Sequence, residues 1–445
     1  MTDYLKPVVL DLINCDKRDQ AWDLIDFYYE HAKTLSDYDV LGYLSLKADK
    51  RDTYLACAEA SYAIAETPEH IYITRINLYK AYNAMNYPEK ALFYIEQNLR
   101  VSPDDYETIA QKAFNISLAG DKATAQAILE DLIFRYPEQA SKLDAALYGK
   151  LLRSGKLSKG IRSFLETSKP ESTVFNKALR MQQWDGIIRP GTTLYVEGEG
   201  GTGDELINIR FFDRLKNLGM NPILYSSGHY RKDTDQLFKR HGYNIVNDTY
   251  SIDPRCKWIP LMSLPAYLEL TENDLWTGPY LKPLKNPKNK LESKKFKIGI
   301  KCSGNPYFAQ DEYRKIPIDK MLEYLPQEAE LYYIDKEETK QHNVIDLSSR
   351  ISGWEDTLDF IDQMDCIVSS CTSLVHAAGA MGKTTFVAVP IAEYYIWTTS
   401  RSDTSSPWYG PNFQVMKQTE LRDWNKPLAE IQGQVKNLMM EKQGD

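Results

Sequence analysis

A period of about 34 residues runs through the first 170 residues, and no other feature of the sequence constrains the fold as strongly. Two residue types with different structural roles follow this period together. They are Pro68, Pro103, Pro137 and Pro170, and Ala21, Ala56, Ala91 and Ala125. Each interval reads as helix, turn, helix and proline turn, with the small residue where the two helices cross closely. Because such units bury their apolar faces only against their neighbours, the pattern predicts a stacked array of helix pairs.

This period is the signature of the tetratricopeptide repeat. About five repeats fit between Tyr4 and Pro170, and we place the repeat domain at residues 1–172. The array is expected to offer a concave face on which a protein, a peptide or a glycan docks, or to serve only as a rigid spacer or as a lid on the next domain. Association of copies of the chain through the repeats is a further expectation.

After the repeats, short apolar strands alternate with helices. Residues 193–197 predict a strand, 198–203 a glycine-rich loop, 204–218 a helix and 222–226 a second strand. This order of elements is typical of a βαβ unit in a parallel sheet.

A polar run with two prolines at residues 283–295 reads as a linker, and a new strand begins at Phe296. The second half is therefore expected to form two Rossmann-like lobes, at residues 184–285 and 295–440. Two such lobes leave a cleft between their strand ends, which is a common ligand site.

The most informative stretch of the second lobe is residues 365–383. An apolar strand at 366–368 leads through small hydroxyl and thiol residues into a helix near 374–381. In open parallel sheets a ligand lies beyond the carboxyl ends of the strands, where the unpaired N–H groups of a helix start attract an anion. The pattern fits a diphosphate site at 372–374 with a hydrogen bond from His376, and it fits equally well close packing of helix on sheet.

The glycine-rich loop of the first lobe also has two interpretations. Gly198, Gly200 and Gly203 give the G-x-G-x-x-G spacing of a dinucleotide site, but Ser226 stands near where the ribose-binding acid is expected. Asp204 follows at the helix start, where it serves either as a catalytic base or as a helix-capping carboxylate.

Three blocks of the sequence together resemble the tetratricopeptide-linked glycosyltransferases related to the heptosyltransferases (glycosyltransferase family 9). The matching positions are Glu199, Gly201, Gly203 and Asp204 in a loop E-x-G-x-G-D; Ser303, Gly304, Asn305, Arg314 and Lys315 in S-G-N-P followed by basic residues and I-P; and Thr372, His376 and Gly379 in T-x-x-x-H-x-A-G-A-x-G. O-linked N-acetylglucosamine transferase is a more distant likeness with the same plan of repeats and two lobes.

The resemblance implies a GT-B fold and an inverting transfer from a nucleoside diphosphate sugar, with no cofactor. Asp204 would be the general base for the acceptor hydroxyl, beside loop residues Glu199, Gly201 and Gly203. The residues that would hold the donor are Ser303, Gly304, Asn305, Arg314, Lys315, Thr372, Ser373, Leu374, His376 and Gly379. Since no D-x-D motif stands at a strand end, the transfer is expected to need no metal.

The composition of the chain limits the classes of partner that it is expected to bind. A net charge of −8 and a pI of about 5.5 argue against nucleic acid as the main partner. The absence of a long apolar run and of a signal-peptide segment predicts a cytoplasmic protein without a membrane span. Six scattered cysteines without a C-x-x-C pair indicate neither a disulfide framework nor a zinc site.

Two other functions fit the same pattern. A degenerate transferase domain under a repeat array would act as a non-catalytic scaffold for protein partners. A nucleotide-sugar epimerase would use a related fold to convert a free nucleotide sugar without any acceptor.

Overall fold

The structure is a computed structural model that describes residues 2–15, 17–139, 148–167, 172–226, 232–284, 290–305, 308, 311–335, 339 and 343–444. The chain forms two compact units. Unit 1 comprises Met1–Ala140 and Pro306–Tyr313, and unit 2 comprises Ser141–Asn305 and Arg314–Asp445. The chain therefore leaves unit 2 after β5 and returns to it within eight residues.

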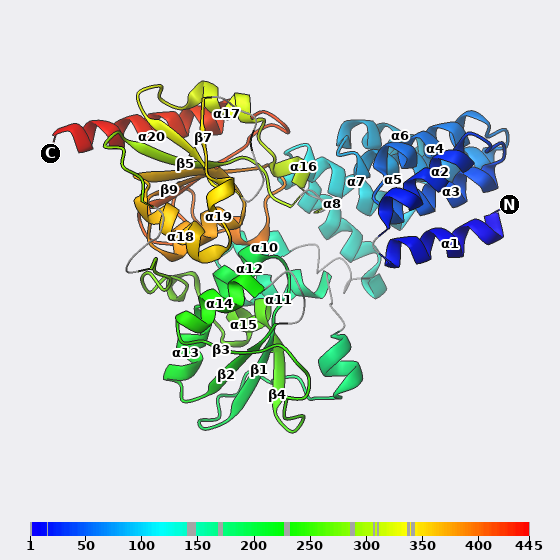
Figure 1. The fold of residues 1–445 in the computed structure, drawn as a ribbon. Helices are drawn as coiled ribbons and strands as arrows, with labels where there is room; N and C mark the ends of the chain where they lie inside the picture. The colour runs from blue at the N-terminus through cyan, green and yellow to red at the C-terminus, as the bar shows by residue number, and fades with distance from the viewer. Residues whose placement is uncertain are drawn as a thin grey trace. The chain divides into compact units, whose positions relative to one another are not determined.

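Unit 1 is a series of helices in which each packs on the next (Figure 1). The helices are α1 (Thr2–Asn14), α2 (Arg18–Tyr29), α3 (Leu35–Lys47), α4 (Arg51–Ala63), α5 (Pro68–Ala84), α6 (Pro88–Val101), α7 (Tyr106–Leu118) and α8 (Lys122–Arg135), followed by the short η1 (Pro137–Gln139). Pro68 stands in the first turn of α5, where its missing N–H costs no hydrogen bond. The predicted array of helix pairs is confirmed.

Three of the four periodic alanines are buried within the array. Ala21, Ala91 and Ala125 are buried in α2, α6 and α8. In α4, Ala56 is only half-buried, whereas its neighbours Cys57 and Ala58 are buried. A Cβ built at Gly42 of α3 would lie 3.6 Å from Cβ of Cys57, so small residues stand where α3 and α4 approach each other closely.

The first lobe of unit 2 is a four-stranded parallel sheet in the order β3-β2-β1-β4. Its strands are β1 (Thr193–Glu197), β2 (Asn221–Tyr225), β3 (Asn244–Val246) and β4 (Lys257–Pro260). Its helices are η2 (Thr173–Ala178), α12 (Thr202–Asn208), α13 (Phe211–Asn217), α14 (Lys232–Arg240), η4 (Leu261–Ser263), α15 (Leu264–Tyr267) and η5 (Glu272–Asp274).

The single helix predicted at 204–218 is wrong in one respect, because the structure breaks it into α12 and α13. The side chain of Arg210 donates from Nε to the carbonyl of Ile207, at 2.7 Å, in the last turn of α12. A side chain that takes this carbonyl competes with the backbone N–H that would continue the helix.

The second lobe is a six-stranded parallel sheet in the order β10-β9-β8-β5-β6-β7. Its strands are β5 (Lys297–Lys301), β6 (Glu330–Tyr333), β7 (Ile345–Asp346), β8 (Cys366–Ser370), β9 (Thr385–Val389) and β10 (Phe413–Lys417). Its helices are α16 (Asp311–Arg314), α17 (Ile318–Tyr324), η6 (Ser348–Arg350), α18 (Trp354–Gln363), α19 (Ser373–Ala380), η7 (Tyr395–Trp397) and α20 (Asn425–Gly444). Every residue of β8 and β9 is buried, as expected for central parallel strands.

These two sheets confirm the predicted fold class, a helical repeat array followed in the chain by two Rossmann-like lobes. One more helix pair, α10 (Tyr148–Arg153) and α11 (Leu157–Thr167), lies within unit 2. Ser158 of α11 donates to the carbonyl of Leu270 at 2.8 Å, and Phe164 stacks on Tyr395 of η7 at 4.8 Å. The predicted domain boundaries stay predictions.

Among the helices of the described ranges, none has both the length and the apolar content needed to span a membrane.

Candidate functional site

The starts of helices α12 and α19 lie against each other and join the two lobes. Each helix begins beyond the carboxyl end of a parallel strand, β1 for α12 and β8 for α19. A Cβ built at Gly203 would lie 2.9 Å from Cδ2 of His376 and 3.6 Å from Cα of Ser373. Glycine at position 203 is therefore required by the close approach of the two helices.

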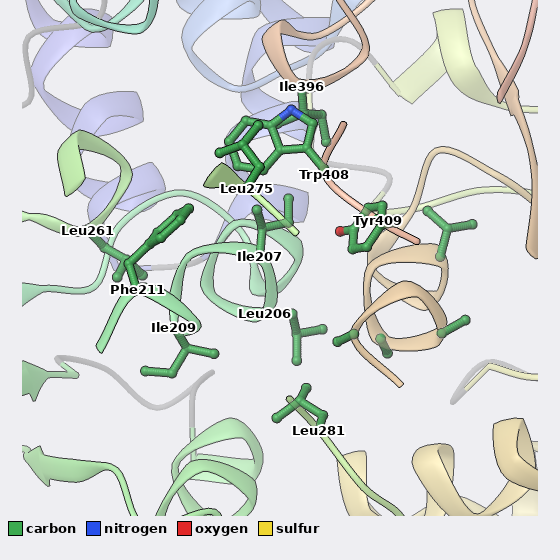
Figure 2. Packing of buried hydrophobic residues seen from close by; sticks show 14 of the residues in the cluster. Leu206, Ile207, Ile209, Phe211, Leu261, Leu275, Leu281, Ile396, Trp408 and Tyr409 are labelled. Carbon is green, nitrogen blue, oxygen red and sulfur yellow. The ribbon is translucent and has the colours of Figure 1, made fainter. Parts of the chain in front are cut away.

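The lobes share one apolar core around this contact, as Figure 2 shows. The buried side chains labelled there from the first lobe, the following segment and the second lobe include Leu206, Ile207, Leu275, Leu281, Trp408 and Tyr409. Because these residues pack as one cluster, the facing starts of α12 and α19 are held by the hydrophobic effect.

Arg210, between α12 and α13, forms hydrogen bonds with groups of both lobes. Its Nη1 donates to the carbonyls of Leu275, at 3.0 Å, and Trp408, at 2.5 Å. Its Nη2 donates to the hydroxyl of Tyr280 at 2.7 Å, and the guanidinium lies 4.5 Å from the centroid of that ring. Sequence reasoning missed this residue, although a charge within the apolar run Ile209–Phe212 is a signal that could have pointed to it.

The glycine-rich loop folds around the carboxylate of Asp204. Oδ2 of Asp204 accepts a hydrogen bond from the backbone N–H of Gly201 at 2.8 Å, as a helix-capping side chain does. Gly200 has a φ of +71°, and a Cβ there would lie 2.5 Å from the same oxygen. The carboxylate of Glu199 accepts from the backbone N–H of Met262 at 3.0 Å. Asp204 therefore caps the start of α12, and its Oδ2 accepts a hydrogen bond in doing so.

The charge of Asp204 also acts on the second lobe. Burial raises the pKa of Tyr395, and the negative charge of Asp204 raises it further. Burial and then Asp204 likewise raise the pKa of Tyr394, to which Glu199 contributes as well. Both carboxylates of the loop therefore lie near η7 and its flanking residue.

The turn between β8 and α19 leaves the helix without a side-chain cap. The hydroxyl of Ser369 donates to the carbonyl of Lys301 at 2.7 Å and lies 3.2 Å from that of Thr372. Thr372, at the cap position, makes no side-chain cap hydrogen bond to α19. Ser373 is half-buried, whereas Leu374 packs into the apolar core.

Of the two basic residues proposed for the donor, only Arg314 reaches this turn. Its Nη1 donates to the carbonyl of Cys371 at 3.0 Å, and its positive charge contributes to the lowered pKa of His376. Lys315, the next residue, is exposed. The structure therefore brings Arg314, and not the exposed Lys315, to the turn before α19. The donor-binding role expected of these two residues stays a prediction.

Ser303, Gly304 and Asn305 follow β5, which pairs with β8 on one side and β6 on the other. Chain order reverses direction at β5, and ligands of open parallel sheets bind at such a switch point. Ser303 and Gly304 are half-buried and Asn305 is exposed. The topology therefore brings this loop and the β8–α19 turn to neighbouring strand ends.

His376 is neutral and deeply buried, with 6% of its surface exposed. Its Nδ1 lies 2.8 Å from the hydroxyl of Tyr409, and its ring stacks on Trp397 at 5.3 Å. Desolvation lowers the pKa of His376 to about 3, and the charges of Arg210 and Arg314 act in the same direction. An uncharged imidazole can donate one hydrogen bond but carries no positive charge, whereas Arg314 brings a guanidinium to the turn before α19.

Gly379 has a packing reason for being glycine. A Cβ there would lie 2.5 Å from Cδ1 of Tyr409, well inside van der Waals contact. The donor-binding role of Gly379 stays a prediction. The distance shows that the absence of a side chain at this position leaves room for the ring of Tyr409.

Within the described residues no group of three or more His, Cys, Asp or Glu side chains could hold a metal ion.

No family model and no curated protein matches the chain, but solved structures do. A tetratricopeptide-repeat protein of Thermus thermophilus is 19% identical, with 40% of this chain and 94% of that one covered, at a TM-score of 0.29. The O-GlcNAc transferase of Thermobaculum terrenum is 12% identical, with 99% of this chain and 93% of that one covered, at a TM-score of 0.40. The E. coli ADP-heptose heptosyltransferase II is 11% identical, with 56% of this chain and 99% of that one covered, at a TM-score of 0.32. All three are of the kinds that the resemblance named, and each likeness is distant.

The contact at Gly203 predicts a matched pair of variants. Gly203→Ala is expected to force α12 and α19 apart and to lower the melting temperature by several degrees, because its Cβ would collide with His376. Gly201→Ala is the control, since its Cβ would meet only Asp204 Oδ2, at 3.7 Å. Thermal unfolding measures both, and equal melting temperatures would refute the tight contact.

The buried imidazole of His376 predicts that the free energy of unfolding decreases as the pH is lowered. Since the pKa of His376 is about 3 in the folded chain and near 6.5 when unfolded, the unfolded state binds the extra proton between these values. The contribution of His376 is full above pH about 6.5 and is lost at about 1.4 kcal/mol per pH unit on lowering the pH towards 3. Urea unfolding at pH 7, 6, 5 and 4 should give a shallower pH dependence for His376→Gln than for the wild type. Identical slopes would contradict the assignment.

Proposed function

We propose that the chain is an inverting glycosyltransferase that moves a sugar from a nucleoside diphosphate donor to an acceptor hydroxyl without a metal ion. The supporting observation is the approach of α12 to α19, with the Asp204 carboxylate on one side and Arg314 at the helix start on the other. Glycosyl transfer needs a carboxylate to accept a proton and positive or N–H groups to stabilise the leaving diphosphate.

In the proposed reaction the acceptor oxygen attacks the anomeric carbon while its proton passes to Asp204. The bond from that carbon to the phosphate oxygen breaks, and its electron pair leaves with the nucleoside diphosphate. One displacement from the opposite face inverts the anomeric configuration.

The donor side is proposed to divide charge and hydrogen bonding between different residues. Arg314 would supply the positive charge, and the uncapped N–H groups at the start of α19 would add their partial charges. The hydroxyl of Tyr409 is proposed to donate to Nδ1 of His376, which would place the hydrogen of the neutral imidazole on Nε2, on the side of Gly203. Ser303, Gly304 and Asn305 would close the crevice from the neighbouring strand.

The same contact also favours a second candidate function. Gly203 packs directly on His376, so protein atoms of α12 lie where the donor diphosphate is expected. A degenerate transferase domain that stays packed in this way would serve as a scaffold beside a repeat array that docks a protein. For a transferase, by contrast, α12 must move away from α19 when the donor binds.

A panel of nucleoside diphosphate sugars tests the enzymatic function. We expect one donor to be hydrolysed or transferred by the wild type, and kcat to fall at least 100-fold in Asp204→Asn, because an amide cannot accept the proton. The amide oxygen can still accept from Gly201, so the helix cap and the fold should persist.

The control is Asp319→Asn, which changes an exposed carboxylate in the first turn of α17 and should leave the rate unchanged. If no donor of the panel raises the melting temperature or is turned over, the scaffold is the better description.

The choice between the two basic residues gives a second test. Arg314→Ala should weaken binding of the matching nucleoside diphosphate about 10-fold or more, because a charge-assisted contact to phosphate is lost. Lys315→Ala, one residue further and exposed, should leave the Kd within twofold. Titration calorimetry measures both constants, and a larger effect at Lys315 would overturn the assignment.

A further inference from the structure

Tyr409 lies close to both Arg210 of the first lobe and His376 of the second lobe. Its hydroxyl oxygen is 2.8 Å from Nδ1 of His376, and its ring centroid is 5.1 Å from Cζ of Arg210. All three side chains are buried. Polar groups that are removed from water in this way depend on one another for hydrogen bonds and for charge compensation.

The guanidinium of Arg210 influences the direction of the hydrogen bond between Tyr409 and His376. Burial raises the pKa of Tyr409 well above its ordinary value, and the charge of Arg210, together with a hydrogen bond from its side chain, opposes this rise. A guanidinium has donors and no acceptor, so it attracts the oxygen of the hydroxyl and repels its hydrogen. This arrangement favours the orientation in which Tyr409 donates to Nδ1 of His376.

Tyr280, a second tyrosine on the same guanidinium, shows this orientation directly. Nη2 of Arg210 donates to the hydroxyl of Tyr280 at 2.7 Å, and that hydroxyl donates to the carbonyl of Leu206 in α12 at 2.8 Å. Because a carbonyl can only accept and a guanidinium can only donate, the direction of both bonds is fixed. Tyr280 therefore accepts from Arg210 and donates to another group, as we expect of Tyr409.

The other ring nitrogen of His376 faces the start of α12. A Cβ built at Gly203 would lie 3.6 Å from Nε2, and the imidazole stacks on Trp397 with 15° between the ring planes. With its hydrogen on Nε2, the neutral ring offers a donor at this junction. With its hydrogen on Nδ1, it offers a lone pair, which repels an anion. The tautomer of His376 therefore decides whether the imidazole favours or opposes an anion here.

We propose that Tyr409 is a positioning residue that keeps the hydrogen of His376 on Nε2, so that the imidazole donates to a diphosphate at the start of α19. The diphosphate rests on the proposed function, whereas the tautomer does not. Tyr409 acts through the imidazole alone, so the loss of its hydroxyl releases the tautomer without removing a charge from the site.

The tautomer is measured on the full-length chain labelled with 15N-histidine, at pH 7 and without ligand, by long-range 1H–15N correlation. The signals of His376 are assigned by their loss in His376→Gln. The wild type should carry the hydrogen on Nε2, and Tyr409→Phe should populate the tautomer with the hydrogen on Nδ1. Tyr280→Phe is the matched control, because it removes the hydroxyl that bonds Arg210 and Leu206, and it should leave the His376 signals unchanged.

Two results would overturn the proposal. One is a hydrogen on Nδ1 of His376 in the wild type, a measurement that needs no variant of Tyr409 to fold. The other is an unchanged His376 tautomer in Tyr409→Phe.

Titration calorimetry with UDP, GDP, ADP and inorganic pyrophosphate tests the consequence for binding. For the probe that binds the wild type most tightly, Tyr409→Phe is expected to raise the Kd about 5-fold, because a hydrogen bond to the anion is weakened. Tyr280→Phe should leave the Kd within twofold.

A double-mutant cycle shows whether Tyr409 acts through His376. In the His376→Ala background, adding Tyr409→Phe should not raise the Kd further. An equal rise in both backgrounds would overturn the positioning role while leaving the proposed function intact. If the wild type binds none of the probes, the proposed function fails, and the spectra of the unliganded chain still decide whether Tyr409 sets the tautomer.

Discussion

The buried guanidinium of Arg210 is the interaction on which the junction of the two lobes depends. A charge removed from water is costly unless hydrogen bonds replace its hydration. Here the replacement comes from the last turn of α12, from the segment after the first lobe and from Trp408 of the second lobe. Loss of one of these hydrogen bonds would cost about 1.5 to 3 kcal/mol, the range for a hydrogen bond to a charged group. The two lobes are consequently held in one arrangement.

This arrangement means that the contact between α12 and α19 both brings the candidate site together and occupies part of it. With the end of α12 fixed by Arg210, the beginning of the same helix meets α19, and Gly203 lies on His376. The carboxylate of Asp204 and the guanidinium of Arg314, to which the proposed function gives the chemistry, belong to the segments at these two helix starts, where Gly203 packs on His376. A donor would have to exchange a helix–helix contact for its own contacts, so its affinity would include the free energy of opening.

Much of the fold could be predicted because it follows from local periodicity. A period of helix pairs predicts stacked repeats wherever it occurs, and apolar strands that alternate with helices predict parallel sheets. The break between α12 and α13 could not be predicted in this way. It depends on Arg210 bonding to Ile207 and to a lobe about 200 residues away, as its bond to Trp408 shows, and the sequence of the helix itself reads as continuous.

The sequence by itself determined the repeat array, the two lobes and the two loops that carry Asp204 and His376, because each depends on neighbours in the chain. Only the tertiary structure decided that Arg314 and not Lys315 reaches α19, that His376 is uncharged, and that α16 is divided between two units. These properties depend on burial and on distances between segments far apart in sequence. No pattern of neighbouring residues contains that information.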